Sequence, residues 1–439
     1  MLALAFATSA STWFYMDRIL IPQQIAEAAA HDRPRGNLSD LYPRWLGARE
    51  LLLHGRNPYS AGITREIQQG YYGRPLDPAR PDDPRDQQAF AYPAYVVFLL
   101  APTIGLPFGT VQIGFRWLLF GLAVISVVLW LRVLRWKVSC ATTVILIVLM
   151  LGWLPMVQGI KLQQLSLLVA GMLAGCGACL SGGWLFSAGV LLALATIKPQ
   201  LAWPLVLWLL LWAGSEWRTR RRFVFGFGLT MLLLLGGAVL VLPGWLRIFI
   251  LAVGHYHQYT QNESVLVVLL GLVLGRILVA GSVLASAFCL WRRRVELASS
   301  ARFGGAFGLV LALTVVIVPM SALYNQVLLA PAILALVQSQ STRGRILLAV
   351  TRVSHVERSL LLILVRLAWI AGGLLLVWPW IATLGLSVAS VWLTPELRQR
   401  LWLMPLYSSL MLPILVFALL LLHIGMIQPH NLRGGAERE

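Results

Sequence analysis

The chain has 439 residues, of which 59% are hydrophobic and 12% are charged. About a quarter of the residues in a soluble globular domain are charged, so this composition excludes an ordinary soluble protein. The net charge of +18 does not indicate nucleic-acid binding, because the arginines cluster in short segments between apolar runs, at 132–137, 218–222, 292–294 and 343–345. This distribution follows the positive-inside rule and predicts that these segments face the cytoplasm.

Apolar runs of membrane-spanning length recur along the chain, for example over 141–157 and 265–291. A helix of about 20 apolar residues crosses the roughly 30 Å hydrocarbon core of a bilayer. Backbone groups in lipid must be hydrogen-bonded within the protein, which favours helices. The sequence therefore predicts an all-α integral membrane protein. With the arginine-rich segments inside, it has about twelve crossings and both termini in the cytoplasm.

Taken in chain order, the regions have distinct compositions. A first transmembrane helix over 1–16 leads into a large outer loop over 17–110, which contains ten of the seventeen acidic residues. A multi-span domain over 111–424 and a cytoplasmic tail over 425–439 follow. No predicted span contains an acidic residue, and the outer loop is expected to carry interfacial helices, over 39–55 and 93–106.

The segment 39–55 has the signals of a short helix. Ser39 or Asp40 would cap its N-terminus, Pro43 would lie in the first turn and Gly55 would end it. A narrow apolar stripe at helical spacing suits a helix on a membrane surface or against other helices. From spacing alone, the ordinary role of Asp40 is that of a helix cap.

Polar residues from distant parts of the chain are predicted on the same face as the outer loop, within 158–164, 198–200, 255–264 and 321–326. Lys198 is one of only three lysines, and it lies at an outer span end, where positive charge is disfavoured. It either snorkels to the interface or has a function, because an ionisable residue at membrane depth is a functional candidate. A cation here suits a phosphate ligand.

Three further polar groups have competing interpretations. His255 and His257, followed by Glu263, match no strong zinc pattern and favour a solvated interfacial loop that contacts lipid phosphate. Tyr324 is explained by an aromatic belt, whereas the neighbouring amides are not. The proline-rich segment contains three acids, Asp82, Asp83 and Asp86, which fit either a divalent-cation site or a solvated loop. Arginines interleave with them, which favours the loop.

Several motifs together resemble glycosyltransferase family 87, the polyprenol-phosphate-sugar-dependent transferases of the GT-C superfamily. They are D-x-Y…G-A-R-x-L-L-x-x-G-x-N-P-Y from Asp40, Y-P at 92–93, K-P-Q at 198–200 and P-M-S-A-L-Y-N-Q at 319–326. The resemblance extends from about residue 40 to about residue 336. Family members carry Asn-Gly-Gln near the outer end of the fourth span, where this chain has I-K-L-Q-Q with Gln163 or Gln164.

The resemblance implies an inverting transfer of a hexose, with mannose the first expectation, from a polyprenyl phosphate to a hydroxyl acceptor on the non-cytoplasmic face of the plasma membrane. Asp40 matches the catalytic carboxylate and would be the general base. Cations would stabilise the leaving phosphate. The candidates for binding the donor phosphate or substrate are Lys198, Gln200, Arg116, His255, His257, Gln163, Tyr324 and Asn325. No cofactor, metal or nucleic acid is expected.

Two other functional classes compete with this interpretation. A transporter or flippase of lipid-linked sugars would carry polar residues in mid-span and show internal pseudosymmetry, neither of which is evident. A membrane scaffold without an active site would tolerate changes at Asp40 and Lys198. The acceptor, whether glycolipid, glycan or protein, is left open by the sequence.

Overall fold

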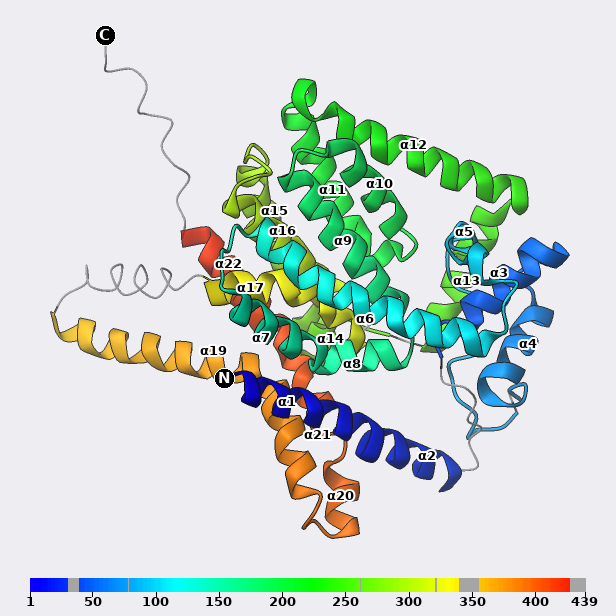
Figure 1. Ribbon diagram of the computed structural model, residues 1–439, viewed down its shortest axis with the longest axis horizontal. Helices are drawn as coiled ribbons and strands as arrows, with labels where there is room; N and C mark the ends of the chain where they lie inside the picture. Colours follow the sequence, from blue (N-terminus) through cyan, green and yellow to red (C-terminus); the bar gives the residue numbers. More distant parts are fainter. Residues whose placement is uncertain (31–38, 78, 261, 320–321, 339–354, 427–439) are drawn as a thin grey trace.

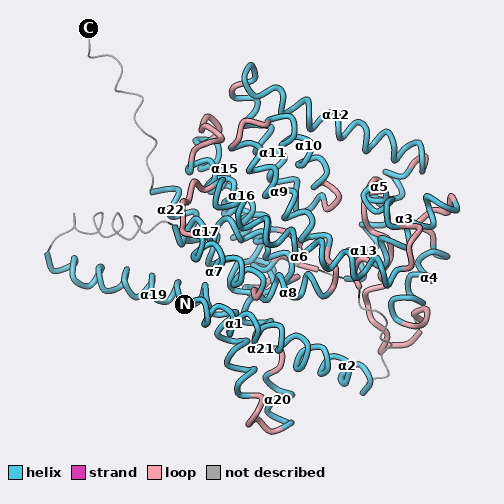
Figure 2. The backbone as a smooth tube through the Cα atoms, in the orientation of Figure 1, coloured by secondary structure: helices cyan, strands magenta, loops and turns pink. Residues whose placement is uncertain are grey.

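The computed structural model describes residues 1–30, 39–77, 79–260, 262–319, 322–338 and 355–426 (Figure 1). Within these ranges the chain is helical and contains no strand, as Figure 2 shows. The predicted all-α fold is therefore confirmed. The arginine-rich segment at 343–345 and the predicted tail from residue 427 onwards lie outside the described residues.

Among the described residues, five helical segments are long and apolar enough to cross a membrane. They are α6 (Phe108–Val133), α12 (Trp217–Val241), α15 (Leu272–Arg293), residues 372–389 of α19 (His355–Ala389), and residues 404–425, which comprise α21 (Met404–Ser408), η4 (Ser409–Met411) and most of α22 (Leu412–Met426). The bent pair α7 (Cys140–Leu151) and α8 (Leu154–Lys161), at 58°, makes a sixth if counted as one span. The chain is thus an integral membrane protein, and the twelve crossings stay a prediction.

Shorter apolar helices pack among these spans. They are α9 (Leu165–Ser181), α10 (Leu185–Ala195), α11 (Pro199–Ser215), α16 (Ala301–Ile317), and the pair η3 (Leu323–Leu329) and α17 (Ala330–Gln338). α16 has almost all of its side chains buried, which is the property of a helix in the centre of a bundle. A count of membrane spans by helix length alone therefore omits short helices, such as α16, that are packed inside the bundle.

Three of the arginine-rich segments, at 132–137, 218–222 and 292–294, lie at one end of this bundle, which we call the basic end. Arg135 Nε donates to the carbonyl of Ser299 at 2.9 Å, and Arg220 Nη1 donates to that of Arg294 at 2.9 Å. The helices α9, α11 and α16 each have one terminus here. Their other termini lie at the opposite end, which we call the loop end, where the predicted outer loop is docked.

The first helix continues well beyond residue 16. α1 (Leu2–Phe14), a π-helical segment η1 (Tyr15–Leu20) and α2 (Ile21–Ala30) follow one another without a break. No glycine occurs before Ala30 to end the helix. Asp17 lies inside this run and its Oδ1 pairs with Lys161 Nζ at 2.6 Å, so the residue expected to begin the outer loop belongs to the first helical run.

The outer loop contains α3 (Tyr42–His54), α4 (Ala61–Tyr72), α5 (Val96–Leu100) and the short η2 (Ala101–Thr103). Gly55 ends α3 in a left-handed conformation with φ 65°, as predicted. The predicted cap by Ser39 or Asp40 is wrong, because Leu41 occupies the N-cap and no side chain caps the helix. The interfacial helix expected over 93–106 is shorter: α5 ends at Leu100, and the short η2, which contains Pro102, follows it.

α3 is packed among other helices. Tyr42 and Trp45 contact Phe108 at the start of α6, with ring centroids 4.9 and 5.1 Å apart. Trp45 Nε1 also donates to the carbonyl of Thr103 at 3.2 Å. Contacts of this kind anchor the outer loop on the transmembrane helices and fix where Asp40, just before α3, is presented.

The remaining helices of the described residues are α13 (Trp245–Thr260), α14 (Val265–Leu270) and α20 (Pro395–Leu401). α13 includes most of the segment expected to be a solvated loop, so that expectation is wrong for 255–260. Gly271, with φ 80°, separates α14 from α15 and allows the chain to turn between them.

Candidate active site

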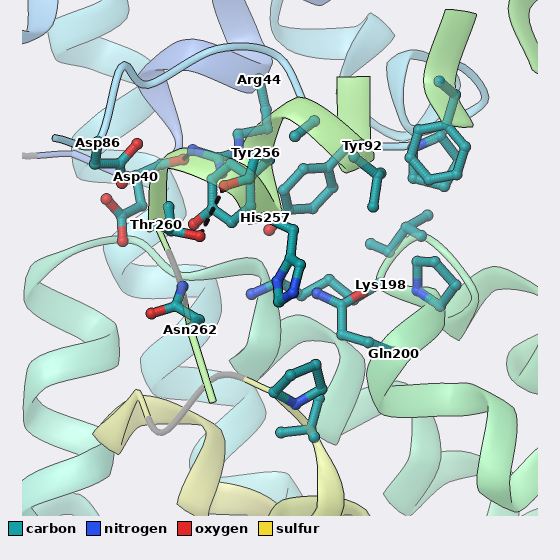
Figure 3. Close-up of a pocket in the computed structure, with 18 of the residues that line it drawn as sticks. Asp40, Arg44, Asp86, Tyr92, Lys198, Gln200, Tyr256, His257, Thr260 and Asn262 are labelled. Carbon is teal, nitrogen blue, oxygen red and sulfur yellow. Dashed lines mark hydrogen bonds between the residues drawn. The ribbon is translucent and has the colours of Figure 1, made fainter. Parts of the chain in front are cut away.

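A cavity of about 620 Å³ lies at the loop end (Figure 3). The outer loop, the turn before α9, the start of α11 and α13 all contribute to its wall. Its polar lining includes Asp40, Arg44, Asp86, Tyr92, Gln164, Lys198, Gln200, Tyr256, His257 and Tyr324. Its apolar lining includes Ile197, Trp203, Phe249, Ile250 and Val253. The cavity therefore offers a charged side and an apolar side to one ligand.

Asp40 is fixed by contacts from three directions. Its backbone N–H donates to the carbonyl of Leu162 at 2.9 Å. Its carboxylate accepts a hydrogen bond from Tyr71 Oη at 3.3 Å and another from Gln164 Nε2. Burial raises the pKa of this carboxyl above its ordinary value, and the charges of Arg44 and Lys198 act in the opposite direction. A partly desolvated, oriented carboxylate is suited to general-base chemistry.

Lys198 is buried beside this carboxylate. Its Nζ donates to Gln164 Oε1 at 3.1 Å and to Ser166 Oγ at 2.7 Å. The ammonium also lies 5.3 Å from the ring centroid of Tyr324 and 5.8 Å from that of Tyr92. No ion pair to Lys198 occurs among the described residues, so the direct contacts of its ammonium are with dipoles and aromatic faces, while the Asp40 carboxylate interacts with it at longer range. The site thus has capacity for an anion.

Arg44 is a second cation in the cavity, and sequence reasoning missed it. Its guanidinium stacks on Tyr92 at 4.6 Å from the ring centroid, and Nη1 donates to the backbone carbonyl of Asp40 at 2.9 Å. Nε is buried and finds no hydrogen-bond partner within the described part of the chain. A buried donor without a partner is rare in proteins, so this guanidinium keeps hydrogen-bonding capacity at the cavity wall.

Asp86 is a second carboxylate on the cavity wall. The interpretation of its segment as a solvated loop did not predict a carboxylate there. Burial raises its pKa above the ordinary value, while the charge of Arg44 opposes this shift. Gln88 donates to both of its carboxylate oxygens, from the backbone N–H at 2.9 Å and from Nε2 at 3.0 Å. The metal-binding alternative for this segment has no support: no cluster of three or more His, Cys, Asp or Glu is placed to hold a metal in the regions that the structure covers.

The structure brings some of the predicted binding residues into the cavity. Lys198, Gln200, His257 and Tyr324 line it together with Asp40. Asn325 is buried behind the wall, where its Oδ1 accepts a hydrogen bond from Ser166 Oγ at 2.8 Å. Asn325 therefore supports the hydroxyl that in turn receives the Lys198 ammonium.

The other predicted binding residues do not line the cavity. Arg116 on α6 and His255 on α13 are exposed, and neither is among the residues that line the cavity. Gln163 is buried in the turn after α8, where its Nε2 donates to the carbonyl of Ile160 at 3.0 Å and its Oε1 accepts from Gln112 at 3.0 Å. Of the two adjacent glutamines, Gln164 is thus the one in the site.

The signal for the missed residues was weak in the sequence. Arg44 lies four residues after Asp40, a spacing that would bring the two side chains together if the helix began at Asp40, but arginine is abundant in this chain. Asp86 is one of three acids in a proline-rich segment, and periodicity says nothing about an irregular loop. Tyr256 is hidden between two histidines in the segment expected to be a loop.

The chain is similar to one described protein family. The model of glycosyltransferase family 87 matches residues 90–319, which is more than half of the chain. The matched segment contains Gln164, Lys198 and His257, while Asp40 and Arg44 precede it. No curated protein and no solved structure matches. The chain belongs to glycosyltransferase family 87 and is a membrane-embedded glycosyltransferase.

Proposed function

We propose that this protein transfers a hexose, with mannose the first candidate, from a polyprenyl-phosphate donor to a hydroxyl of a glycolipid or glycan. Transfer inverts the anomeric configuration and takes place at the non-cytoplasmic face of the plasma membrane. The observation that carries the proposal is the bridge in which Gln164 contacts both the Asp40 carboxylate and the Lys198 ammonium. The side-chain amide of Gln164 thereby lies between the proposed base, Asp40, and the proposed phosphate-binding cation, Lys198.

A lipid-borne donor is supported by the apolar side of the cavity. Trp203 on α11 and Ile250 on α13 both line it, yet they are 46% and 61% exposed at the surface of the protein. In a membrane protein such exposed apolar side chains face lipid. A donor with its tail in the bilayer can therefore place its phosphate and sugar in the cavity.

The leaving phosphate is expected at Lys198 and Arg44. As the glycosidic bond breaks, negative charge develops on the phosphate oxygen, and positioned cations stabilise that charge more in the transition state than in the ground state. Within the described residues the Lys198 ammonium is in direct contact with no carboxylate, and Arg44 Nε has no hydrogen-bond partner. Arg44 thus takes the role that sequence reasoning assigned to Arg116.

Asp40 acts as general base. Its carboxylate takes the proton of the acceptor hydroxyl as that oxygen attacks the anomeric carbon, and the polyprenyl phosphate leaves from the opposite face of the sugar. A single displacement of this kind inverts the configuration. Tyr71 and Gln164 hold the carboxylate during the proton transfer. The raised pKa brings Asp40 closer to the operating pH and makes it a more effective base.

The non-cytoplasmic location is supported by the two ends of the bundle. The arginine-rich segments at 132–137, 218–222 and 292–294 lie at the basic end, for which the positive-inside rule predicts a cytoplasmic location. Asp40 and Lys198 lie at the loop end, at the opposite termini of α9 and α11. If the basic end is cytoplasmic, the cavity opens towards the other side.

The proposal is tested with the purified full-length protein in lipid vesicles. Radiolabelled polyprenyl-phosphate mannose and glucose are supplied in turn, with a lipid extract of the cells that make the protein as the source of acceptor. We expect a labelled glycolipid from one donor, and no product from nucleotide sugars. Transfer from a nucleotide sugar, or movement of the labelled donor across the bilayer without product, would contradict it.

A further inference from the structure

The transfer described above leaves one charged group of the cavity without a role. Asp86 lines the cavity beside Asp40, and Figure 3 shows the two carboxylates next to each other on one wall. Among the described residues, neither lysine nor arginine forms an ion pair with Asp86. Each carboxylate oxygen has two acceptor positions, and Gln88 occupies only one of them on each oxygen. The remaining positions are available to a ligand.

The loop around Asp86 is held in place by several contacts. Tyr72 Oη donates to the backbone carbonyl of Asp86, and Gln68 Nε2 donates to that of Gln87 at 3.1 Å. Arg74 pairs with Asp83 at 2.5 Å earlier in the same loop. Gln88 has a left-handed backbone with φ 53°, which costs free energy for a residue other than glycine. The loop therefore fixes the direction of the Asp86 carboxylate.

We propose that Asp86 binds the acceptor, by accepting a hydrogen bond from a hydroxyl that neighbours the attacking one. Asp40 takes the proton of the attacking hydroxyl, and Asp86 holds a second hydroxyl of the same molecule. The acceptor is then a neutral polyol, such as a sugar or cyclitol headgroup. An anionic group at this position would be repelled by two carboxylates. This inference rests on the proposed transfer and names the acceptor class of the same site.

The aromatic lining fits this acceptor class. Tyr256 and Tyr92 flank the same part of the cavity in Figure 3. Their rings present flat apolar faces beside polar groups, as a sugar ring requires, since one of its faces is formed by C–H groups and its rim by hydroxyls. Arg44 is stacked on Tyr92, with its guanidinium carbon 4.6 Å from the ring centroid.

The test compares Asp86→Asn with Asp82→Asn, which changes an exposed acid of the same loop that does not line the cavity. Acceptor KM, donor KM and the hydrolysis of the donor without acceptor are measured. We expect Asp86→Asn to raise the acceptor KM by about 10-fold to 100-fold, because a hydrogen bond to a charged group is lost. Donor KM and donor hydrolysis should match those of Asp82→Asn.

A second measurement uses monodeoxy analogues of the acceptor. The unmodified protein should lose affinity for the analogue that lacks the hydroxyl bound by Asp86, and Asp86→Asn should not distinguish that analogue from the parent compound. This coupling is a double-mutant cycle between protein and ligand. Equal losses in both proteins, or an acceptor KM of Asp86→Asn equal to that of Asp82→Asn, would overturn the proposal. So would a fall in donor hydrolysis, because Asp86 would then act in the base chemistry.

Binding without any donor separates this inference from the proposed function. Methyl glycosides and myo-inositol are titrated into the purified protein, with saturation-transfer NMR as the readout. If they bind the unmodified protein and Asp86→Asn abolishes binding, the acceptor site stands even when no polyprenyl-phosphate sugar is used. If transfer from such a donor occurs and Asp86→Asn leaves the acceptor KM unchanged, the transfer stands and the acceptor site falls.

Discussion

Asp40 and Lys198 contact the two ends of a single side-chain amide, that of Gln164. Gln164 Nε2 donates to the Asp40 carboxylate, and its Oε1 accepts from Lys198 Nζ at 3.1 Å. Neither charge is in direct contact with the other, so each keeps a face free for a ligand. The bridge also couples the two groups electrostatically, because the positive charge of Lys198 favours the ionised form of Asp40.

Replacement of Lys198 tests this coupling. Lys198→Met removes a positive charge that lowers the Asp40 pKa, so that pKa should rise further above its ordinary value. The base acts only when ionised, and activity is lost as the pH falls through its pKa. The acidic limb of the pH profile of kcat/KM should therefore move to higher pH.

The loss of a phosphate-binding cation should also reduce kcat, by about 100-fold. Lys137→Met is the matched control, since Lys137 is exposed and lies outside the cavity. An acidic limb at unchanged pH in Lys198→Met would show that the two groups are not coupled.

Arg44 and Arg116 form a second matched pair. Arg44→Met removes a guanidinium with a buried, unpartnered Nε from the cavity wall, and kcat/KM should fall by about 100-fold. Arg44→Lys should recover only part of this loss, because an ammonium lacks the planar shape that stacks on Tyr92. Arg116→Met should keep full activity, as Arg116 is exposed on α6. Equal activities of Arg44→Met and Arg116→Met would exclude Arg44 as a phosphate ligand.

These residues show how far sequence alone could define the site. Hydropathy predicts helices in lipid because every backbone polar group there must be hydrogen-bonded within the protein. This requirement holds whatever the side chains are. Lys198 could be found because a lysine at an outer span end breaks a strong charge bias. Asp86 could not, since its burial depends on how an irregular loop docks, and Arg44 resembles many other arginines until α3 is placed.

The fold was predictable to a similar degree. Gly55 ends α3 because a left-handed terminus favours glycine, and this is a local property. The cap of α3 was mispredicted because Asp40 is oriented by tertiary contacts to Tyr71 and Gln164 instead. The number of spans does not follow from helix length, because α10, with 11 residues, is shorter than the length expected of a spanning helix.

Gly70 allows α4 to approach α3 closely. A Cβ at this position would collide with the ring and hydroxyl of Tyr42, and that ring is held against Phe108 at 4.9 Å. Gly70→Ala should therefore displace α4, move Tyr71 away from Asp40 and lower both the melting temperature in detergent and the rate of transfer.

Gly62→Ala on the same helix is the control. Nothing lies within 4 Å of its Cβ position, and alanine is favoured over glycine in a helix by roughly 0.5–1 kcal/mol. Its melting temperature should stay the same or rise slightly. A Gly70→Ala protein as stable and active as Gly62→Ala would show that α3 and α4 are not packed as described.

Asp40 should reduce stability at neutral pH. Its pKa is raised in the folded protein, so the protonated form favours folding and this contribution is lost as the pH rises through the folded pKa. Asp40→Asn removes the cost of burying a charge and should raise the melting temperature at neutral pH. The difference from the unmodified protein should shrink as the pH is lowered, as thermal melts in detergent would measure. A melting temperature that falls at neutral pH would mean that the ionised carboxylate stabilises the fold.

The most direct test of the account is the rate of sugar transfer by Asp40→Asn. Purified protein in vesicles receives the labelled polyprenyl-phosphate sugar that the unmodified protein uses, together with its acceptor. Loss of the general base should lower kcat by about 100-fold or more, while donor binding and the melting temperature show that the fold is intact. Transfer by Asp40→Asn at the rate of the unmodified protein would contradict the assignment of Asp40 as the catalytic base.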